Sequence, residues 1–199
     1  IEQMKQQRYN IGTFYGEIDA AYVVNPDKAF FKDKTRYYWQ VKVETREGSC
    51  VSDIATFETG LSSWSADWIG GPQSDGTVLL FQKPFQIKGN VTYARLYICG
   101  LGYFGASLDG APLDDTYYKP LVTDYGTRYH PENTTLYEAS GHRVTYYTYD
   151  VTRELGIGNH ELSIDVGNGY YCNVDRIMEE PNFSFGQPRL IFELHITED

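Results

Sequence analysis

The chain has 199 residues, which is enough for one large domain or two small ones and for a core that needs no disulfide or metal. Its formal net charge of -10 argues against nucleic acid or an anionic membrane as a partner, because both attract clustered Lys and Arg. A hydrophobic content of 41% excludes a disordered chain. No apolar run approaches the roughly 20 residues of a membrane-spanning helix.

Tyrosine is unusually frequent, with 18 residues. Its ring packs well on the half-buried surface of a strand while the hydroxyl reaches water, and packing is the commoner reason for its use. The same side chain also suits a sugar-binding face. A neutral glycan would be indifferent to the negative charge of the chain.

The three cysteines, Cys50, Cys99 and Cys172, are odd in number and widely spaced. They therefore form neither a disulfide framework nor a zinc site, and we expect buried structural thiols. The segment 1–10 is polar and is no signal peptide. Because it lacks an initiator Met, we expect the chain to start within a longer protein, and the compartment stays open.

Short aromatic or β-branched runs alternate with Gly and Pro along the whole chain, which predicts an all-β protein built as a sandwich or jelly roll. In the first part we expect a strand over 19–24 and another over 35–44, then a turn over 46–49 and a returning strand over 51–59. The 35–44 strand has period-2 alternation, which predicts one buried face. That face comprises Tyr37, Trp39, Val41 and Val43.

Residues 60–71 join the two parts and contain two tryptophans in a Gly/Ser-rich stretch, which indicates a linker held by packing. The second part predicts a larger β-domain. Its expected strands cover 79–87, 91–99, 102–108, 145–151, 160–166 and 190–196.

Local signals mark the turns of the second part. Asp109-Gly110 supplies the positive φ angles of a tight hairpin. We expect Asp150 to accept hydrogen bonds from nearby backbone amides, and Thr152 to cap one helical turn. Gly167 and Gly169 predict unusual backbone angles in a loop.

An ordered set of short motifs is the most specific feature of the chain. They are Phe57–Leu61, Trp64–Gly70, Ala94–Ile98, Gly100–Phe104, Leu108–Gly110, Thr123–Tyr125, Tyr147–Thr152 and Gly167–Tyr171. Their order and spacing resemble the N-terminal region of bacterial α-L-rhamnosidases of glycoside hydrolase family 78. The resemblance covers roughly residue 35 to the C-terminus.

The resemblance implies a fibronectin type III-like β-sandwich over 1–61 and a β-jelly-roll, galactose-binding-like domain over 62–199. About half of the first domain's strands are visible, so either it is truncated or its early strands are degenerate. The resemblance also implies a catalytic (α/α) barrel in the parent chain as partner. Bacterial glycan degradation would favour a periplasmic or extracellular location.

Five residues of the second part are candidates for carbohydrate binding, because they place aromatic platforms beside polar groups in loops. They are Asp124, Tyr125, Asn168, Tyr170 and Tyr171. In family members the jelly roll can bind rhamnose with help from calcium, or simply buttress the barrel. No motif here aligns with that site, so we assign no metal ligand and expect no other cofactor.

The chain offers no natural catalytic pair. Glycoside hydrolysis needs two carboxylates across the scissile bond, whereas Asp114–Asp115 and Glu179–Glu180 are adjacent residues in polar loops. The histidines lack metal-ligand spacing. They are His130, His142, His160 and His195. The resemblance places the acid and base in the barrel, so we expect this region to be non-catalytic.

Three interpretations remain open from the sequence. The first is a non-catalytic accessory region of an α-L-rhamnosidase that supports the barrel and contacts rhamnose-containing glycans. The second is an independent carbohydrate-binding module. The third and weakest is a surface adhesion protein, which predicts a long apolar patch on an exposed sheet.

Overall fold

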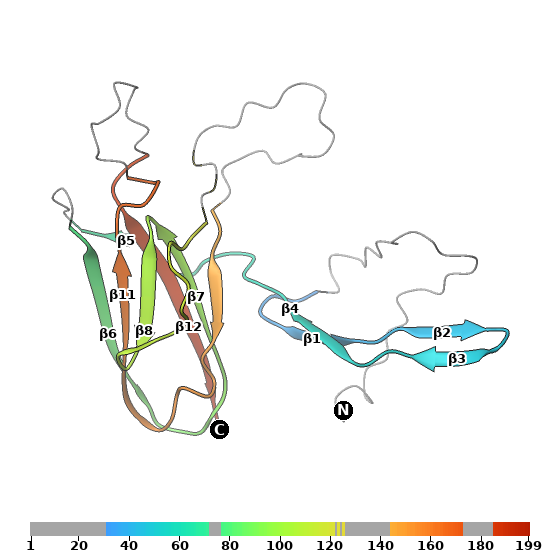
Figure 1. Cartoon of the computed structure of the whole chain (residues 1–199). Coiled ribbons are helices and arrows are strands. Elements are labelled where there is room, and N and C mark those ends of the chain that lie inside the picture. The colour runs from blue at the N-terminus through green and yellow to red at the C-terminus, as the bar shows by residue number, and fades with distance from the viewer. Residues whose placement is uncertain (1–30, 72–76, 122, 124, 126–143, 173–184) are drawn as a thin grey trace, which may run out of the picture. The chain divides into compact units, whose positions relative to one another are not determined.

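The computed structural model describes residues 31–71, 77–121, 123, 125, 144–172 and 185–199. The chain divides into two compact units, Ile1–Ser63 and Trp64–Asp199. In the described ranges every regular element is a strand, so the all-β prediction is confirmed (Figure 1). No helix of these ranges could span a membrane. The strand expected over 19–24 lies outside the described residues.

The first unit contains two small antiparallel sheets, β1 with β4 and β2 with β3. The strands are β1 (Arg36–Trp39), β2 (Lys42–Thr45), β3 (Gly48–Val51) and β4 (Ala55–Glu58). A tight turn joins β2 to β3 and ends at Gly48, whose φ is 148°. The turn predicted over 46–49 is therefore confirmed.

The single strand predicted over 35–44 is wrong, because it is broken at Gln40 and Val41 into β1 and β2. On the returning chain, Ser52 fills the gap. Its hydroxyl oxygen accepts a hydrogen bond from the Val41 N–H at 3.1 Å, and its own N–H donates to the Val41 carbonyl at 2.9 Å. This interruption changes the pairing partner from β4 to β3.

The buried face predicted for this strand is also largely wrong. Tyr37 packs against Phe31 and stacks on Phe57, with ring centroids 5.1 and 5.3 Å away. The other three predicted members, Trp39, Val41 and Val43, are each 46% exposed. A two-stranded sheet cannot bury a face by itself, and each sheet described in this unit has only two strands.

The second unit is built from two four-stranded antiparallel sheets, in the orders β10-β7-β12-β5 and β6-β11-β8-β9. All six strands predicted here are found, and the short β5 and β9 are additional. The strands are β5 (Ile69–Gly70), β6 (Leu79–Ile87), β7 (Val91–Leu101), β8 (Phe104–Leu108), β9 (Ala111–Pro112), β10 (Tyr147–Asp150), β11 (Gly158–Val166) and β12 (Arg189–Glu198).

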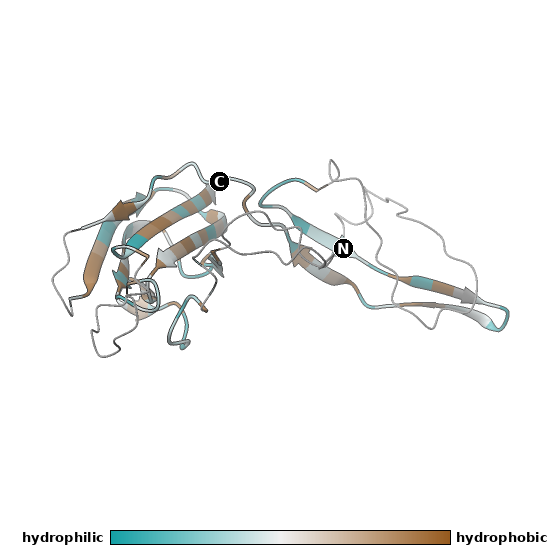
Figure 2. Cartoon of the chain, turned by 90° about the horizontal axis from the view of Figure 1, so that it is seen from above, coloured by the Kyte–Doolittle hydropathy of each residue, from teal (hydrophilic) through white to brown (hydrophobic). Residues whose placement is uncertain are grey.

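One core lies between the inner faces of these sheets. Leu96 and Ile98 of β7 meet Leu162 and Ile164 of β11 there, all at most 2% exposed. Figure 2 shows the hydrophobic and hydrophilic bands that alternate along these strands. Each such side chain contributes about 1.5–3 kcal/mol through burial. The core therefore fixes the strand ends from which the loops emerge.

The turns of the second unit follow the sequence signals closely. Asp109 and Gly110 have φ angles of 51° and 81°, as predicted for the hairpin. The Asp150 carboxylate accepts a hydrogen bond from the Thr152 N–H at 3.2 Å, also as predicted. The helical turn expected after Thr152 is wrong, because the Thr152 hydroxyl accepts a hydrogen bond from the Ala94 N–H at 2.9 Å and the segment forms only a turn.

Two of the three cysteines are buried as expected. Cys99 lies in β7 and Cys172 follows β11, and burial raises the pKa of the Cys99 thiol to about 12. Cys50 is exposed, so the expectation of a buried thiol is wrong there. It lies on the β2–β3 hairpin, whose two strands bury neither face.

The outer face of the β10-β7-β12-β5 sheet is buried as well. Tyr97 of β7 and its neighbour Glu193 of β12 point away from the core, yet they are only 1% and 9% exposed. The segment that opens the second unit lies against this face. Trp64 packs on Tyr146 with ring centroids 5.7 Å apart, and Ser65 hydrogen-bonds to Glu193. The prediction that packing holds this segment is confirmed.

Glu193 is the polar anchor of that contact. It accepts hydrogen bonds from the backbone N–H groups of Ser65 and Ala66, and the Nε2 of His195 lies 2.7 Å from its other oxygen. Burial raises the pKa of this carboxyl, but the hydrogen bonds outweigh burial and lower it to about 2. The ionised carboxylate is therefore stabilised by folding.

Replacing Glu193 by Gln should lower the free energy of unfolding by about 2 kcal/mol at neutral pH, because buried N–H groups lose an anionic acceptor. The folded-state pKa lies below the ordinary value of 4.5, so the carboxylate stabilises fully above that value and loses its effect as the pH falls toward 2. Urea denaturation at pH 7 and pH 3 measures both effects.

The exposed carboxylate of Glu154 provides the matched control, since Glu154→Gln makes the same charge change outside this contact. The difference between Glu193→Gln and Glu154→Gln should shrink at pH 3. An equal loss of stability in both variants at pH 7 would contradict the anchoring role.

Candidate functional site

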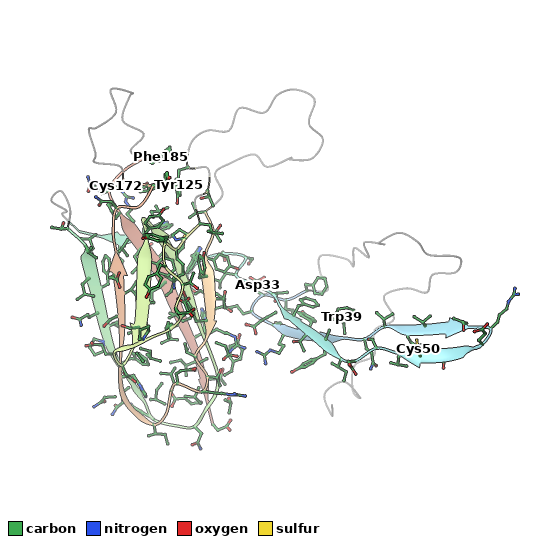
Figure 3. All side chains as sticks on the ribbon, viewed as in Figure 1. Asp33, Trp39, Cys50, Tyr125, Cys172 and Phe185 are labelled. Atoms are coloured by element: carbon green, nitrogen blue, oxygen red, sulfur yellow. The ribbon has the colours of Figure 1, made fainter. Side chains whose placement is uncertain are left out.

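Most of the predicted carbohydrate-binding residues lie on loops at one end of the second unit, where β7 and β11 end and β12 begins. Figure 3 labels Tyr125, Cys172 and Phe185 at this end. Tyr170 and Tyr171 follow β11 and Phe185 precedes β12. Asp124 lies outside the described residues.

Tyr125 and Tyr171 are brought together, with ring centroids 5.2 Å apart and an interplanar angle of 85°. Phe185 completes this cluster at 5.4 Å from Tyr125, and its N–H donates to the Tyr171 carbonyl at 2.9 Å. Burial raises the pKa of the Tyr125 hydroxyl, which therefore stays neutral. No sequence motif around Phe185 predicted that it would pack against Tyr125 and Tyr171.

Tyr170 belongs to a second cluster, which we call the tyrosine end: Tyr103, Tyr118 and Tyr170. The ring of Tyr103 lies 5.5 Å from that of Tyr118 and 6.5 Å from that of Tyr170. Tyr118 and Tyr170 are 75% and 64% exposed. In the sequence, Tyr103 belongs to the Gly100–Phe104 motif, which predicted only a structural role, and Tyr118 belongs to none of the motifs.

Glycines hold the loops of the tyrosine end together. A Cβ on Gly102 would overlap the carbonyl oxygen of Gly167, and one on Gly169 would lie 2.7 Å from the Tyr103 nitrogen. Gly102 and Gly169 also have positive φ angles, 123° and 52°. The unusual angle predicted for Gly169 is confirmed, whereas the one predicted for Gly167 is wrong, because its φ is not positive. The two backbones can approach only because Gly102 and Gly169 lack side chains.

Lys119 anchors Tyr118. Its side chain is 2% exposed, forms an ion pair with Asp114, and donates a hydrogen bond to the Tyr149 hydroxyl at 2.9 Å. Its carbonyl accepts from the Phe104 N–H at 2.6 Å. Tyr118 itself has φ of 60°, an uncommon conformation for a residue with a side chain. The buried lysine thus fixes the backbone next to Tyr118, whose ring contacts Tyr103.

The same contacts assign Asp114 a structural role. Burial raises the pKa of its carboxyl, but hydrogen bonds from Lys119, Tyr149 and the Thr116 N–H outweigh this and lower it overall. An ionised carboxylate that is already paired is poorly suited to act as a general acid. The other adjacent pair, Glu179–Glu180, lies outside the described residues.

Asn168 opens the loop that carries Tyr170. Its carbonyl accepts a hydrogen bond from the Cys172 N–H at 3.1 Å, which closes a tight turn. The residue is partly exposed. Its assignment as a partner for sugar hydroxyls stays a prediction.

The described part of the chain contains no group of three or more His, Cys, Asp or Glu side chains that could hold a metal. His160 lies 2.6 Å from the Asp109 carboxylate and 2.8 Å from the Gly156 carbonyl, which is a structural arrangement. His195 contacts Glu193. His130 and His142 lie outside the described ranges.

Comparison with known proteins decides the family. Residues 89–199 match the α-L-rhamnosidase N-terminal domain, and residues 17–63 match the Rha78A-like, N-terminal immunoglobulin domain. The chain belongs to the α-L-rhamnosidase N-terminal domain family. The predicted resemblance to the N-terminal region of these enzymes is thereby confirmed.

The curated relatives of this rhamnosidase N-terminal region carry the name α-L-rhamnosidase. An α-L-rhamnosidase of Formosa agariphila is 26% identical over 82% of the chain, and one of Alteromonas sp. is 27% identical over 82%. The solved α-L-rhamnosidase from Dictyoglumus thermophilum matches 85% of the chain with a TM-score of 0.65 and 25% identity. The chain spans only 18–19% of the length of these relatives.

Substituting Gly102 by Ala should separate the two loops that carry Tyr103 and Tyr170. Because the new methyl group meets a backbone carbonyl at a positive φ, we expect a loss of about 2–3 kcal/mol in the free energy of unfolding. Gly158→Ala is the control, since its φ is 146° and no atom lies within 4 Å. Urea denaturation of both variants measures the difference, and equal losses would show that loop contact is unimportant.

Proposed function

We propose that this region is the non-catalytic accessory part of an α-L-rhamnosidase. It comprises a fibronectin type III-like domain over 1–61 and a jelly roll over 62–199. In the parent enzyme it supports the catalytic (α/α) barrel and contacts rhamnose-containing glycans.

The exposed tyrosine end carries this proposal. Large aromatic side chains that stay in water on a folded domain mark a binding surface when they are clustered. Tyr118 and Tyr170 are 75% and 64% exposed, and both contact Tyr103. Buried Lys119 and the close-packed glycines hold them in place, so binding costs little side-chain ordering.

The chemistry of these side chains suits a neutral sugar. A tyrosine ring packs against the C–H face of a pyranose and its hydroxyl can pair with a sugar hydroxyl. Tyr125, Tyr171 and Asn168 belong to the same proposed surface, where the Asn168 amide would bind sugar hydroxyls. Asp124 lies outside the described residues, and its role in binding a hydroxyl stays a prediction from the sequence. A deoxy sugar such as rhamnose also presents a methyl group, which favours an aromatic contact over a purely polar one.

Exposed apolar side chains in the first unit support the proposed contact with the catalytic barrel. Trp39, Val41 and Val43 lie close together in the sequence and are each 46% exposed. Exposed large apolar side chains of this kind favour contact with another domain of a longer protein. The same observation favours the weaker adhesion interpretation, which also requires an apolar partner.

Tyr170→Ala should weaken binding of an L-rhamnosyl disaccharide by about ten-fold, because loss of one aromatic platform removes on the order of 1–2 kcal/mol. Ile157→Ala is the matched control, since Ile157 is 66% exposed but lies in the turn before β11, at the opposite end. Isothermal titration measures both. No heat with wild-type chain at millimolar ligand would reject a binding site that works without the barrel.

The purified 199-residue chain should leave a chromogenic rhamnoside intact. Asp114 belongs to one of the candidate catalytic carboxylate pairs, and the pKa of its carboxyl is lowered. It forms an ion pair with Lys119, so it cannot donate a proton at neutral pH. Release of the chromophore over days measures this. Turnover that disappears on replacing a carboxylate of this chain would overturn the non-catalytic assignment.

A further inference from the structure

A hollow of about 360 Å³ lies beside β5 on the second unit. Its volume falls in the range of small-molecule sites. Six residues line it: Trp68, Gly70, Gly71, Gln187, Pro188 and Arg189.

Three of these side chains carry hydrogen-bond donors that no acceptor among the described residues uses. Within the described ranges, the Trp68 indole, the Gln187 amide and the Arg189 guanidinium make no hydrogen bond or ion pair. Trp68 is 41% exposed, and Gln187 and Arg189 are also exposed. No acidic residue is among the six that line the hollow, although the whole chain has a net charge of -10. The hollow is therefore a locally cationic spot with an aromatic wall.

Strand pairing fixes the geometry of the hollow. Arg189 pairs with Gly70 of β5 on one side and with Leu101 of β7 on the other. A Cβ on Gly70 would lie 3.3 Å from the Pro188 carbonyl oxygen and 3.6 Å from the Cγ of Arg189. Glycine at position 70 thus leaves room beside the stem of the arginine. Figure 1 shows β5 next to the start of β12.

We propose that this hollow binds a sugar ring that carries a carboxylate, as in a hexuronic acid. The guanidinium of Arg189 matches a carboxylate with two parallel hydrogen bonds. The Trp68 indole offers an apolar face for the C–H side of the ring, and the Gln187 amide can both donate to and accept from a hydroxyl. The site differs from the tyrosine end in its residues and in the charge of its ligand.

The chain offers a specific reporter for this site. It has three tryptophans, so its ¹H–¹⁵N NMR spectrum has three indole signals, and Trp68→Phe identifies the one from the hollow. The full chain is titrated with D-glucuronate, D-glucose and acetate. Glucuronate should shift the Trp68 signal with a millimolar dissociation constant. Glucose and acetate, which each lack one half of the recognised group, should bind at least ten-fold more weakly.

Matched variants test the role of the charge. Arg189→Gln should weaken glucuronate binding by at least ten-fold, and Arg189→Lys, which keeps the charge but loses the bidentate geometry, by less. Arg153→Gln removes an exposed arginine from the turn after β10 and should leave binding unchanged. If Arg189→Gln does not fold, judged by circular dichroism, Arg189→Lys and the three wild-type titrations still decide.

Three results would overturn the proposal. They are an unshifted Trp68 signal with glucuronate, equal binding of acetate, and equal losses in Arg189→Gln and Arg153→Gln. Failure of L-rhamnose to bind at the tyrosine end would not be one of them, because Trp68 reports only on the hollow.

Discussion

The close approach of two backbones at Gly102, Gly167 and Gly169 is the constraint on which the candidate site depends. The loop after β7 and the loop after β11 leave different strands of different sheets, and they meet only where side chains are missing. This contact places Tyr103 beside Tyr170. The stabilising contacts come from the rings, whereas Gly102 and Gly169 supply only space and positive φ angles. The tyrosine end is thus built from backbone geometry first and aromatic contacts second.

Burial on both faces of β7 and β12 gives that surface a rigid base. In an ordinary two-layer sandwich the residues that alternate with the core point into water. Here Tyr97 and Glu193 are covered by the segment that begins with Trp64, and Glu193 satisfies the N–H groups of that segment. Because a buried N–H without an acceptor would be costly, the carboxylate makes this third layer possible. The entry to the second unit is therefore part of its fold and not a tether.

The sequence predicted the fold of the second unit well because its strands bury alternate residues in one core, as in β6 and β11. It failed in the first unit, where the strand breaks at Gln40 and Val41 and two-stranded sheets leave Trp39 exposed. The site was predicted in part. Tyr125 and Tyr171 were selected from polar, aromatic loops, but their packing partner Phe185 comes from a distant segment. The strand order, β10-β7-β12-β5 in one sheet, decides which loops meet at one end of the sandwich. Hydrophobic periodicity in the sequence carries no information about that order.

The net charge of the chain and the charge of the residues that line the hollow predict different ligands. Which charge matters depends on how far the ligand is from the surface. A net charge of -10 repels anions in the far field, yet at physiological salt that field decays over about 8 Å. At contact distance a ligand meets only the lining residues. The tyrosine end is best suited to a neutral sugar, whereas Arg189 in the hollow lies beside no acidic lining residue and can select a carboxylate. Salt should therefore affect the two surfaces differently, since only the second recognises its ligand by charge.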